Sequence, residues 1–426
     1  MTDYYHPRIE TMPRKALDKL QEGLLRKICR HAWNMETYRR LWSQSGFTSA
    51  PSSREEFSKL PFISKDVIVD GFPYGFCAVP RDELARLYLT SGSSGRPAGV
   101  LLSRSDIDAL ANFGARSLMM RGVRPGDVYQ MTLAYGLWAA GLSGHASAER
   151  LGCLVIPAGP GNTQRQIWLM KTMGTTVLNA VPSYHLRIAQ VGEEMGVDFS
   201  KLPLRVALST AGRLEPSTRK EIQERLDAEL FNSYGTTETG GIGNECEAHD
   251  GLHVWHDVCL LEVVDPKTGE QVAAGEVGEI VVTTLQRFTM PLVRYRTGDR
   301  GKVLSEEPCA CGRTHQRISE DISRLDDMLK IRGVLVSPST VERIVKHCPE
   351  LSGNFLIQVR PRSHPALICE LNSWVRTAFE DELVKAVAAE LKNKTGLTFE
   401  VKLVRPGELP AERGEKRVQI IPDLPV

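Results

Sequence analysis

The chain has 426 residues, of which 42% are hydrophobic and 25% are charged, as in an ordinary globular protein of two or three domains. Lysine and arginine total 53 against 52 aspartates and glutamates, so a net charge of +1 gives no support to a nucleic-acid-binding protein or a polybasic membrane anchor. No apolar run approaches the ~18 residues of a membrane span, and the N-terminus lacks a signal-peptide pattern. We therefore expect a cytoplasmic enzyme with neither membrane nor nucleic acid as a partner.

The first two thirds of the chain predict helices and then an alternation of strands and helices. Apolar residues recur at three- and four-residue spacing within residues 1–50, which is typical of amphipathic helices. Further on, short apolar runs predict buried strands at 87–89, 154–156, 176–178 and 206–208, and the stretches between them predict helices at 163–173, 184–195 and 215–229. This alternation is typical of βαβ units and a parallel sheet.

The remaining chain departs from this pattern twice. Between residues 259 and 285 strands are joined by turns, with a hairpin signal at Asp265-Pro-Lys-Thr-Gly269. Beyond residue 326 the pattern predicts helices at 341–347 and 379–393 and strands at 354–359, 366–372 and 398–404. The charged junction near Ser323 is typical of an exposed linker. We expect an α/β protein with a large domain of parallel sheets flanked by helices over residues 1–325 and a small α+β domain over residues 326–426.

A loop of hydroxyl-bearing and glycine residues follows the predicted strand at 87–89. Its members are Thr90, Ser91, Gly92, Ser93, Ser94 and Gly95. Glycines let the backbone turn its N–H groups toward an anion, and hydroxyls add donors, so the loop suits the phosphates of a nucleotide. It lacks the Gly-Lys-Ser/Thr ending of a Walker A loop. A flexible surface turn is the alternative for such a loop taken alone.

Two further glycine turns present polar side chains. The segment 231–241 contains Tyr234, whose ring can stack on a base, and Glu238, whose carboxylate can hold Mg²⁺. The segment Tyr295-Arg-Thr-Gly-Asp299 presents a carboxylate that can accept two hydrogen bonds from ribose hydroxyls. Each motif taken alone is more often a turn than a site.

The order of these motifs resembles that of the adenylate-forming superfamily and, within it, the phenylacetate–CoA ligase family. The phosphate loop is followed by Tyr-Gly-Thr-Thr-Glu at 234–238, Tyr-Arg-Thr-Gly-Asp at 295–299 and Arg-Leu-Asp-Asp-Met at 324–328. The similarity runs over nearly the whole chain and includes residues 7–12, 60–65, 135–138, 181–184 and 290–296. It implies a large N-terminal adenylate-forming domain and a small, mobile C-terminal domain.

The resemblance also implies a reaction and its site residues. A carboxylate attacks the α-phosphorus of ATP, pyrophosphate leaves, and coenzyme A then takes the acyl group from the acyl-adenylate. The loop 90–95 would grip ATP, and Glu238 would act in catalysis and hold Mg²⁺. Further contacts with ATP or AMP are implied for Gly212, Ser233, Tyr234, Gly235, Thr236, Asp299 and Arg324.

The resemblance places two functional residues near and beyond the domain boundary. Asp326 matches the hinge position, and Lys416 is implied as the catalytic lysine of the adenylation step. The C-terminal tail departs from the family pattern, because Glu415 stands directly after glycine where relatives usually have lysine. A second departure is the spacing of Gly212 and Glu215, which are adjacent in relatives.

The resemblance places an acyl pocket around Tyr135, Gly136, Trp138 and Ala140. Small residues at 139–141 leave space, so an aryl or arylacetic acid is the implied substrate. Ordinary core packing is the alternative for Trp138 and the alanines. Relatives often form homodimers, which makes a homodimer possible here as well.

Three cysteines and a histidine form a candidate structural zinc site. Nine cysteines, an odd number in a long chain, argue against a disulfide framework. Cys246 and the pair Cys309 and Cys311 lie in polar, turn-rich sequence, with His249 and His253 nearby. Zinc prefers four such ligands in a tetrahedron. The resemblance favours His253 over His249, and two unrelated loops with free thiols are the alternative.

The sequence therefore predicts an AMP-forming aryl-carboxylate–CoA ligase that uses ATP, Mg²⁺ and coenzyme A and carries zinc. A carrier protein, an amine or another acceptor could replace coenzyme A. A third alternative is a non-catalytic nucleotide-binding or scaffold protein, against which Glu238, Asp299 and the phosphate loop argue.

Overall fold

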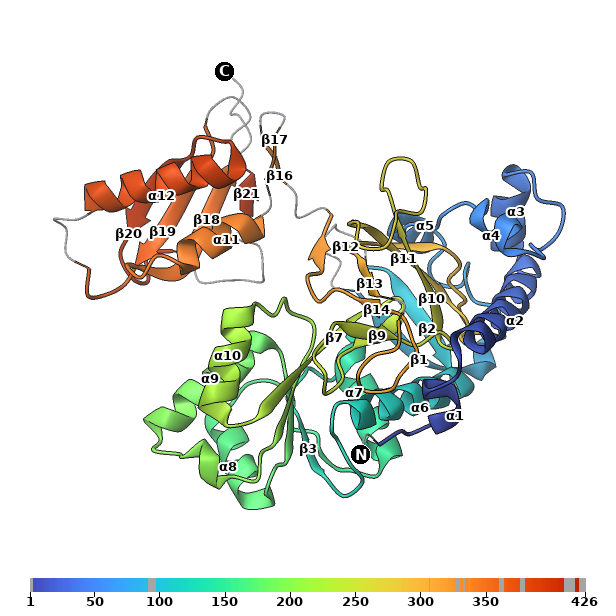
Figure 1. Cartoon of the computed structure of the whole chain (residues 1–426), viewed down its shortest axis with the longest axis horizontal. Helices are drawn as coiled ribbons and strands as arrows, with labels where there is room; N and C mark the ends of the chain where they lie inside the picture. Colours follow the sequence, from blue (N-terminus) through green and yellow to red (C-terminus); the bar gives the residue numbers. More distant parts are fainter. Residues whose placement is uncertain are drawn as a thin grey trace. The chain divides into compact units, whose positions relative to one another are not determined.

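A computed structural model of the chain describes residues 3–90, 97–305, 307–325, 329–331, 334–336, 338–359, 364–375, 380–409 and 418–420 (Figure 1). The chain divides into two compact units, Met1–Ser323 and Arg324–Val426. The sequence-based boundary after residue 325 lies close to this division.

The first unit contains most of the helices and strands. Its helices are α1 (Pro7–Glu10), α2 (Arg14–Trp33), α3 (Glu36–Gln44), α4 (Arg54–Ser58), α5 (Lys65–Asp70), α6 (Arg104–Met120), α7 (Ala139–Leu151), α8 (Thr163–Met173), α9 (Pro182–Glu194) and α10 (Pro216–Leu226), with 3-10 turns at Arg81–Glu83 and Phe199–Lys201. Its strands are β1 (Leu84–Leu89), β2 (Gly99–Ser103), β3 (Val128–Met131), β4 (Leu154–Ile156), β5 (Val177–Ala180), β6 (Val206–Ser209), β7 (Glu229–Thr236), β8 (Gly240–Asn244), β9 (Leu252–Val254), β10 (Cys259–Val264), β11 (Gly278–Thr284), β12 (Tyr295–Gly301), β13 (Val303–Ser305) and β14 (Arg317–Ile318), and β15 (Ser323–Arg324) spans the division.

A nine-stranded sheet with the order β13-β14-β9-β8-β7-β6-β5-β3-β4 forms the centre of the first unit. The five strands from β7 to β4 run parallel, whereas β8, β9, β14 and β13 join them in antiparallel pairs. The strand predicted at 87–89 is not one of them, because it lies in β1, which pairs with β2 in a separate antiparallel sheet. The fold class predicted from sequence is therefore confirmed, with an antiparallel extension on one side of the parallel strands.

Both faces of the parallel strands are covered by helices, which explains why their sequences are mostly apolar. On one face Leu178, Ala207 and Leu230 pack against α8, α9 and α10. On the opposite face their chain neighbours Val177 and Phe231 pack against α6 and α7. Neighbouring residues of a strand face opposite sides, so apolar residues at consecutive positions serve both layers.

The predicted helices agree with the structure, and their ends have local causes. The helix predicted at 163–173 is α8. Helix α9 begins at Pro182, two residues before the predicted start, because proline suits the first helical position. Helix α10 ends at Leu226 because Asp227 takes a left-handed conformation with φ of 48°.

The hairpin signal at 265–269 produces a turn that brings residues 270–272 back against the end of β10 in a short antiparallel pairing. The Asp265 carboxylate accepts hydrogen bonds from the N–H groups of Lys267 and Thr268 at 2.7 and 3.0 Å. Strand β11 begins only at Gly278, where it pairs with β10 in the register Val264↔Glu279. The segment between the turn and β11 is a loop with one isolated bridge, because glycine and charged residues interrupt the apolar alternation there.

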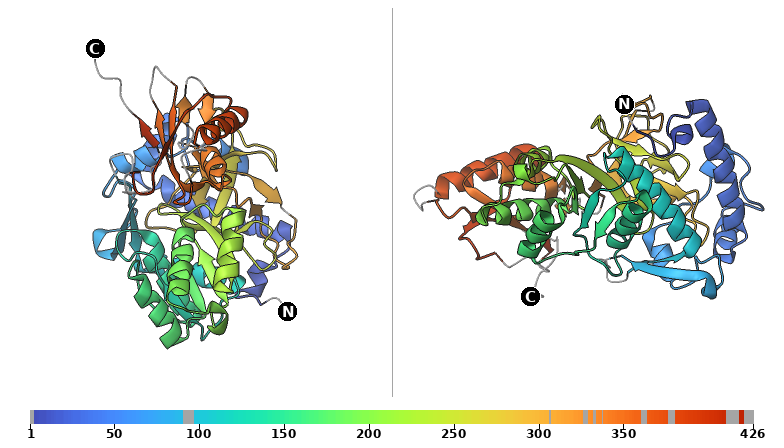
Figure 2. Two further views of the ribbon diagram at one scale, coloured as in Figure 1. Left: turned by 90° about the vertical axis from the view of Figure 1, so that its left-hand side faces the viewer. Right: turned by 90° about the horizontal axis from the view of Figure 1, so that it is seen from below.

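The N-terminal helices form a separate layer. Residues of α2, α3, α4 and α5 pack with β1 and β2 in one apolar cluster. In the right-hand view of Figure 2, as in Figure 1, these blue helices lie away from the green helices α8 to α10.

The second unit is a small α+β body, as predicted. Its elements are β16 (Leu329–Ile331), β17 (Val334–Val336), α11 (Pro338–Lys346), β18 (Leu351–Val359), β19 (Ala366–Leu371), α12 (Glu380–Thr395), β20 (Glu400–Val404) and β21 (Val418–Ile420). The sheet order is β20-β19-β18-β21, and α11 and α12 pack against it in one apolar cluster (Figure 1). The sequence did not predict β21, a three-residue strand that pairs in parallel with β18.

Arg116 and Asp257 form a buried ion pair between α6 and the loop before β10. The two guanidinium nitrogens lie 3.1 and 3.0 Å from the two carboxylate oxygens, and the side chains are 1% and 6% exposed. We predict that Asp257→Asn lowers the free energy of unfolding by about 3–5 kcal/mol, because it leaves a buried charge without its partner.

Chemical denaturation followed by tryptophan fluorescence measures this loss. The matched control is Glu55→Gln, which removes an exposed ion pair with Lys59 and should leave stability unchanged. A loss of less than about 1 kcal/mol for Asp257→Asn would contradict the prediction.

Candidate functional site

Most of the described residues predicted for the site follow the parallel strands, at the end where each strand finishes. Tyr135 follows β3, Gly212 follows β6, and Ser233 and Tyr234 lie in the C-terminal half of β7. Parallel strands have their carboxyl ends at one edge of the sheet, and ligands of open α/β sheets bind at that edge. The βαβ topology therefore brings these residues to one edge from positions far apart in the sequence.

The segments predicted to hold the nucleotide contact each other directly. The Ser233 hydroxyl donates to the carbonyl oxygen of Ser209 at 2.9 Å, which joins the ends of β6 and β7. Gly212 lies where a Cβ atom would come within 2.9 Å of the Pro182 ring, so the close approach of these two loops requires glycine.

Tyr234 and Asp299 lie together, although they come from different sheets. The Tyr234 hydroxyl donates to Oδ2 of Asp299 at 2.7 Å. Asp299 is 6% exposed and lies on β12, while the Tyr234 side chain is half-buried. The hydrogen bond fixes the aromatic ring beside a carboxylate, the arrangement that the two motifs require if they bind one nucleoside.

The turn between β7 and β8 holds Glu238. The Thr236 hydroxyl contacts the Thr239 hydroxyl at 2.8 Å and accepts a hydrogen bond from its N–H at 3.1 Å. The Glu238 carbonyl oxygen accepts a hydrogen bond from the buried Arg287. Glu238 itself is 7% exposed. At Gly235 a Cβ atom would come within 2.6 Å of the Gly240 carbonyl oxygen, so only glycine permits this tight turn.

Thr90 closes the base of the phosphate loop. Its N–H donates to the carbonyl oxygen of Ala98 at 3.0 Å, and its hydroxyl accepts from the Ala98 N–H at 2.9 Å. The N–H of Leu89 donates to the carbonyl oxygen of Leu137 at 2.8 Å. The start of the phosphate loop and the Tyr135–Trp138 segment are therefore neighbours.

The structure shows two further residues near Tyr135, His145 and Glu149, that were not predicted from the sequence. The Tyr135 hydroxyl lies 3.0 Å from Nδ1 of His145, and Nε2 of His145 lies 3.0 Å from a Glu149 carboxylate oxygen. A carboxylate only accepts, so the Nε2 nitrogen that faces Glu149 is the donor of that hydrogen bond. The four-residue spacing of the histidine and the glutamate on one helix was the available signal.

The other residues predicted for the acyl pocket are half-buried or exposed. Trp138 occupies the N-cap position of α7. Its side chain and Ala140 are partly buried and pack against the apolar cluster that α6 and α7 form with the parallel strands. Gly136 is exposed.

Several predicted site residues lie outside the described residues. They are Ser91, Gly92, Ser93, Ser94, Gly95, Asp326 and Lys416. Arg324 is described as an exposed residue at the first position of the second unit.

The four predicted metal ligands form one buried cluster. Sγ of Cys246, Sγ of Cys309, Sγ of Cys311 and a ring nitrogen of His253 all lie within 4.8 Å of one another. The Cys246 and Cys309 sulfurs are 3.7 Å apart, and Cys311 Sγ lies 3.5 Å from His253 Nε2. Zinc–sulfur bonds of about 2.3 Å in a tetrahedron place two sulfurs about 3.8 Å apart, so the spacing fits zinc.

Strand pairing and hydrogen bonds distinguish the two candidate histidines. His253 lies on β9 opposite Arg317 of β14, and β14 follows the loop that holds Cys309 and Cys311. His249 lies elsewhere, with its ring nitrogens 3.0 Å from Glu229 and 3.3 Å from Glu245. The structure therefore brings His253 and not His249 to the cysteines.

Two of the three sulfurs of the cluster, those of Cys309 and Cys311, are in an environment that favours thiolates, whereas the hydrogen bond to Cys311 and burial raise the pKa of Cys246. Hydrogen bonds from Cys246 and from His253 lower the pKa of Cys311 to about 2. Burial acts in the opposite direction on Cys309, but hydrogen bonds from His253 and from the backbone lower its pKa overall. Thiolates are the form in which cysteine binds metal.

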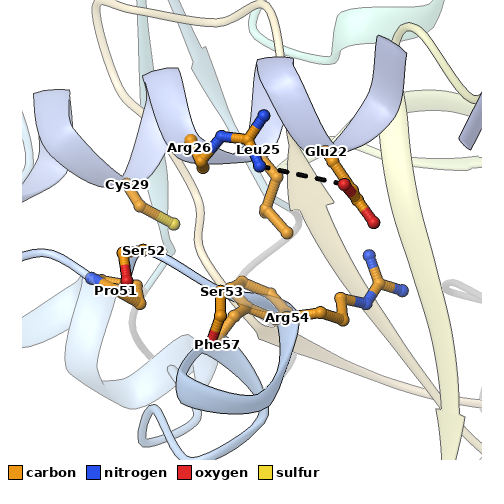
Figure 3. A pocket seen from close by; sticks show the side chains of 9 residues that line it. All are labelled: Glu22, Leu25, Arg26, Cys29, Pro51, Ser52, Ser53, Arg54 and Phe57. Carbon is orange, nitrogen blue, oxygen red and sulfur yellow. Dashed lines mark ion pairs between the residues drawn. The ribbon is translucent and has the colours of Figure 1, made fainter. Parts of the chain in front are cut away.

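A pocket of about 230 Å³ opens between α2 and α4, away from these residues (Figure 3). Glu22 and Arg26 form an ion pair at 3.8 Å on its rim, and the sulfur of Cys29 points into it. Burial raises the pKa of Cys29 to about 12, so the thiol stays protonated. The lining includes no residue predicted for the site.

Among the described residues, no helix is both long and apolar enough to cross a membrane.

Comparison with known proteins agrees with the geometry. Residues 35–290 match the AMP-binding enzyme family, and residues 333–423 match the AMP-binding enzyme C-terminal domain. Phenylacetate-coenzyme A ligase of Thermus thermophilus is 36% identical over 98% of this chain and 99% of the relative. The Escherichia coli enzyme of the same name is 33% identical over 96% of this chain and 95% of the relative.

A solved structure is similar over nearly the whole chain. 2-Hydroxyisobutyryl-CoA ligase in the postadenylation state, in complex with its acyl-AMP, is 27% identical with a TM-score of 0.88, covering 98% of this chain and 92% of that chain. The chain therefore belongs to the AMP-binding enzyme family and, within the adenylate-forming superfamily, to the phenylacetate–CoA ligase family.

Proposed function

We propose that this enzyme activates an aryl or arylacetic acid with ATP to an acyl-adenylate and then transfers the acyl group to coenzyme A. The observation that carries the proposal is the hydrogen-bonded pair of Tyr234 and Asp299 at the carboxyl edge of the parallel strands. Relatives over nearly the full chain that are named phenylacetate-coenzyme A ligases support the aromatic substrate.

In the first half-reaction the substrate carboxylate attacks the α-phosphorus of ATP, and pyrophosphate leaves. The protein makes no covalent bond in this step, so its contribution is to position the reactants and stabilise charge. The loop 90–95 would donate hydrogen bonds to the phosphates. Asp299 would accept the ribose hydroxyls, while Gly212 and Tyr234 would border the adenine; Ser233, Gly235 and Thr236 would shape this wall.

Glu238 is the residue proposed to hold Mg²⁺. A carboxylate oxygen is a ligand that Mg²⁺ prefers, and the Arg287 hydrogen bond to the Glu238 backbone fixes the turn that carries it. When bound, the ion would neutralise phosphate charge.

The second half-reaction is proposed to need movement of the C-terminal unit. Asp326 would be the hinge, Arg324 would contact a ribose or phosphate oxygen, and Lys416 would bridge carboxylate and phosphate during adenylation. Tyr135, Gly136, Trp138 and Ala140 would border the acyl group, with His145 orienting the tyrosine hydroxyl.

We further propose that the cluster of Cys246, His253, Cys309 and Cys311 holds a structural zinc ion. The support is the close spacing of its four buried donors. With all four positions taken by protein ligands, the ion would tie the loop after β8 to the loop before β14 and would supply no open position for substrate. A cytoplasmic location suits an enzyme whose nine cysteines form no disulfide. A homodimer stays a prediction, which light scattering on the purified chain would test.

Product analysis over a panel of aryl and arylacetic acids, with and without coenzyme A, tests the proposed reaction. We expect acid-dependent release of pyrophosphate and AMP, with an acyl-CoA thioester formed only when coenzyme A is present. Acyl-adenylate that accumulates regardless of coenzyme A would indicate a carrier protein, an amine or another acceptor. ATP binding without turnover of any acid would indicate a non-catalytic protein.

Asp299→Asn tests the proposed ribose contact. The amide keeps the shape but loses the charge that strengthens hydrogen bonds from the hydroxyls, so we expect kcat/KM for ATP to fall about 10- to 100-fold. Steady-state kinetics with ATP varied measure this ratio. The matched control is Asp265→Asn in the exposed turn after β10, for which kcat/KM should stay unchanged. Equal kinetics for both variants would contradict the ribose role.

Elemental analysis of the purified protein tests the zinc proposal. We expect about one zinc per chain, and a loss of most of it in Cys311→Ser, because a hydroxyl replaces a thiolate ligand. Cys259→Ser is the control, since this cysteine is buried in an apolar cluster away from the four donors and should not change the zinc content. Less than about 0.2 zinc per wild-type chain would contradict the proposal.

A further inference from the structure

The N-terminal segment, residues 3–12, lies directly on the loop that carries two of the four cluster ligands. The Tyr4 hydroxyl donates to the carbonyl oxygen of Cys311 at 2.9 Å. Gly312 has a φ of 80°, and a Cβ atom there would come within 2.3 Å of the Tyr4 hydroxyl. Glycine at position 312 thus leaves the space that the Tyr4 hydroxyl occupies.

A buried ion pair fastens the same two segments. Nε of Arg313 lies 2.7 Å from Oε2 of Glu10, and the two side chains are 1% and 0% exposed. Oε1 of Glu10 accepts a hydrogen bond from the N–H of His6 at 2.7 Å, and Arg313 also donates to the Asp3 carbonyl oxygen at 3.2 Å. Opening the cysteine loop outward would separate this pair and leave two charges unpaired in the interior, which is costly.

Backbone and side-chain hydrogen bonds continue the contact along the loop. The N–H of Thr314 donates to the Glu10 carbonyl oxygen at 3.2 Å, and its hydroxyl donates to the Met12 carbonyl oxygen at 2.6 Å. Nε2 of His315 lies 3.1 Å from the Ile9 carbonyl oxygen. The segment therefore contacts the loop at four consecutive positions, Gly312 to His315, immediately after Cys311.

We propose that residues 3–12 act as a cover that holds the Cys309–Cys311 loop closed and sets the rate at which zinc leaves the cluster. Glu10 and Arg313 are its positioning residues: they touch neither substrate nor the metal, and they act through the backbone beside Cys311 and through the interaction of the Arg313 guanidinium with the Cys311 sulfur. Groups that orient metal ligands change metal affinity about 10- to 100-fold when they are mutated. Three thiolates and one Zn²⁺ would carry a net charge of −1, which the neighbouring Arg313 cation offsets. The proposal rests on the proposed zinc site.

The experiment compares two glutamates that each lie in a buried ion pair with arginine. Glu10→Gln breaks the pair beside the cysteine loop. Glu262→Gln is the matched control, because Glu262 pairs with Arg294 at 3.1 Å, with both side chains 6% exposed, in a different part of the first unit. Release of zinc from the full-length chain to a chromophoric chelator is measured at a temperature at which all proteins are folded. Reaction of the cysteines with a thiol reagent is measured in parallel.

We expect Glu10→Gln to release zinc about 10- to 100-fold faster than the wild type, and Glu262→Gln to release it at the wild-type rate despite a similar loss of stability. Tyr4→Phe removes one hydrogen bond to the Cys311 carbonyl oxygen and should accelerate zinc release a few-fold. This variant replaces Glu10→Gln in the experiment if Glu10→Gln does not fold.

The proposal would be overturned if Glu10→Gln, or Tyr4→Phe in its place, released zinc at the same rate as the control Glu262→Gln. A wild-type chain that contains no zinc would contradict the zinc proposal alone. In that case the reaction with the thiol reagent still tests whether residues 3–12 cover the loop. Faster reaction of Cys309 and Cys311 in the variant than in the control supports the proposal, and equal reaction rates overturn it.

Discussion

The whole of the first unit depends on the burial of its parallel strands between two layers of helices. Strands β5, β6 and β7 are apolar on both sides, with Leu178 and Val177 as one example of neighbours that enter different clusters. Once both faces are covered, the strands can offer polar groups to a ligand only at their ends. Gly212 and the Tyr234 motif follow these ends, so burial of the strands also decides where this part of the proposed chemistry takes place.

Contacts between distant segments then turn separate motifs into one candidate site. Tyr234 and Asp299 are joined by a hydrogen bond between two sheets, and Leu89 is joined to Leu137 at the base of the phosphate loop. The Ser233 hydroxyl connects two strand ends in the same way. These bonds fix loops that are rich in glycine and would otherwise have many conformations, and such preorganisation is what an enzyme needs when it works by positioning its substrates.

The candidate zinc cluster is a second place where distant segments meet. Its four donors come from the loop after β8, from β9 and from the loop before β14, and β9 and β14 pair side by side. The N-terminal segment is fastened to the same loop by Glu10 and Arg313. The start of the chain is thereby tied to residues beyond position 300.

The sequence by itself determined the class of the fold and the identity of the family, because both follow from local patterns. Apolar runs of strand length between helical stretches led to the parallel sheet, and the order of the glycine turns led to the adenylate-forming superfamily. The ends of α8 and β4 agree with the residues predicted for them. The antiparallel strands β8, β9, β13 and β14 were not predicted, since they are short and depend on pairing rather than on propensity.

Only the tertiary structure decided which residues meet. It brought His253 rather than His249 to the cysteines, because strand pairing places one residue of β9 beside β14 while hydrogen bonds to Glu229 and Glu245 hold the other histidine elsewhere. It also added His145 beside Tyr135 and Glu10 beside Arg313. Such contacts join residues through the packing of whole elements, and no spacing within one segment encodes them.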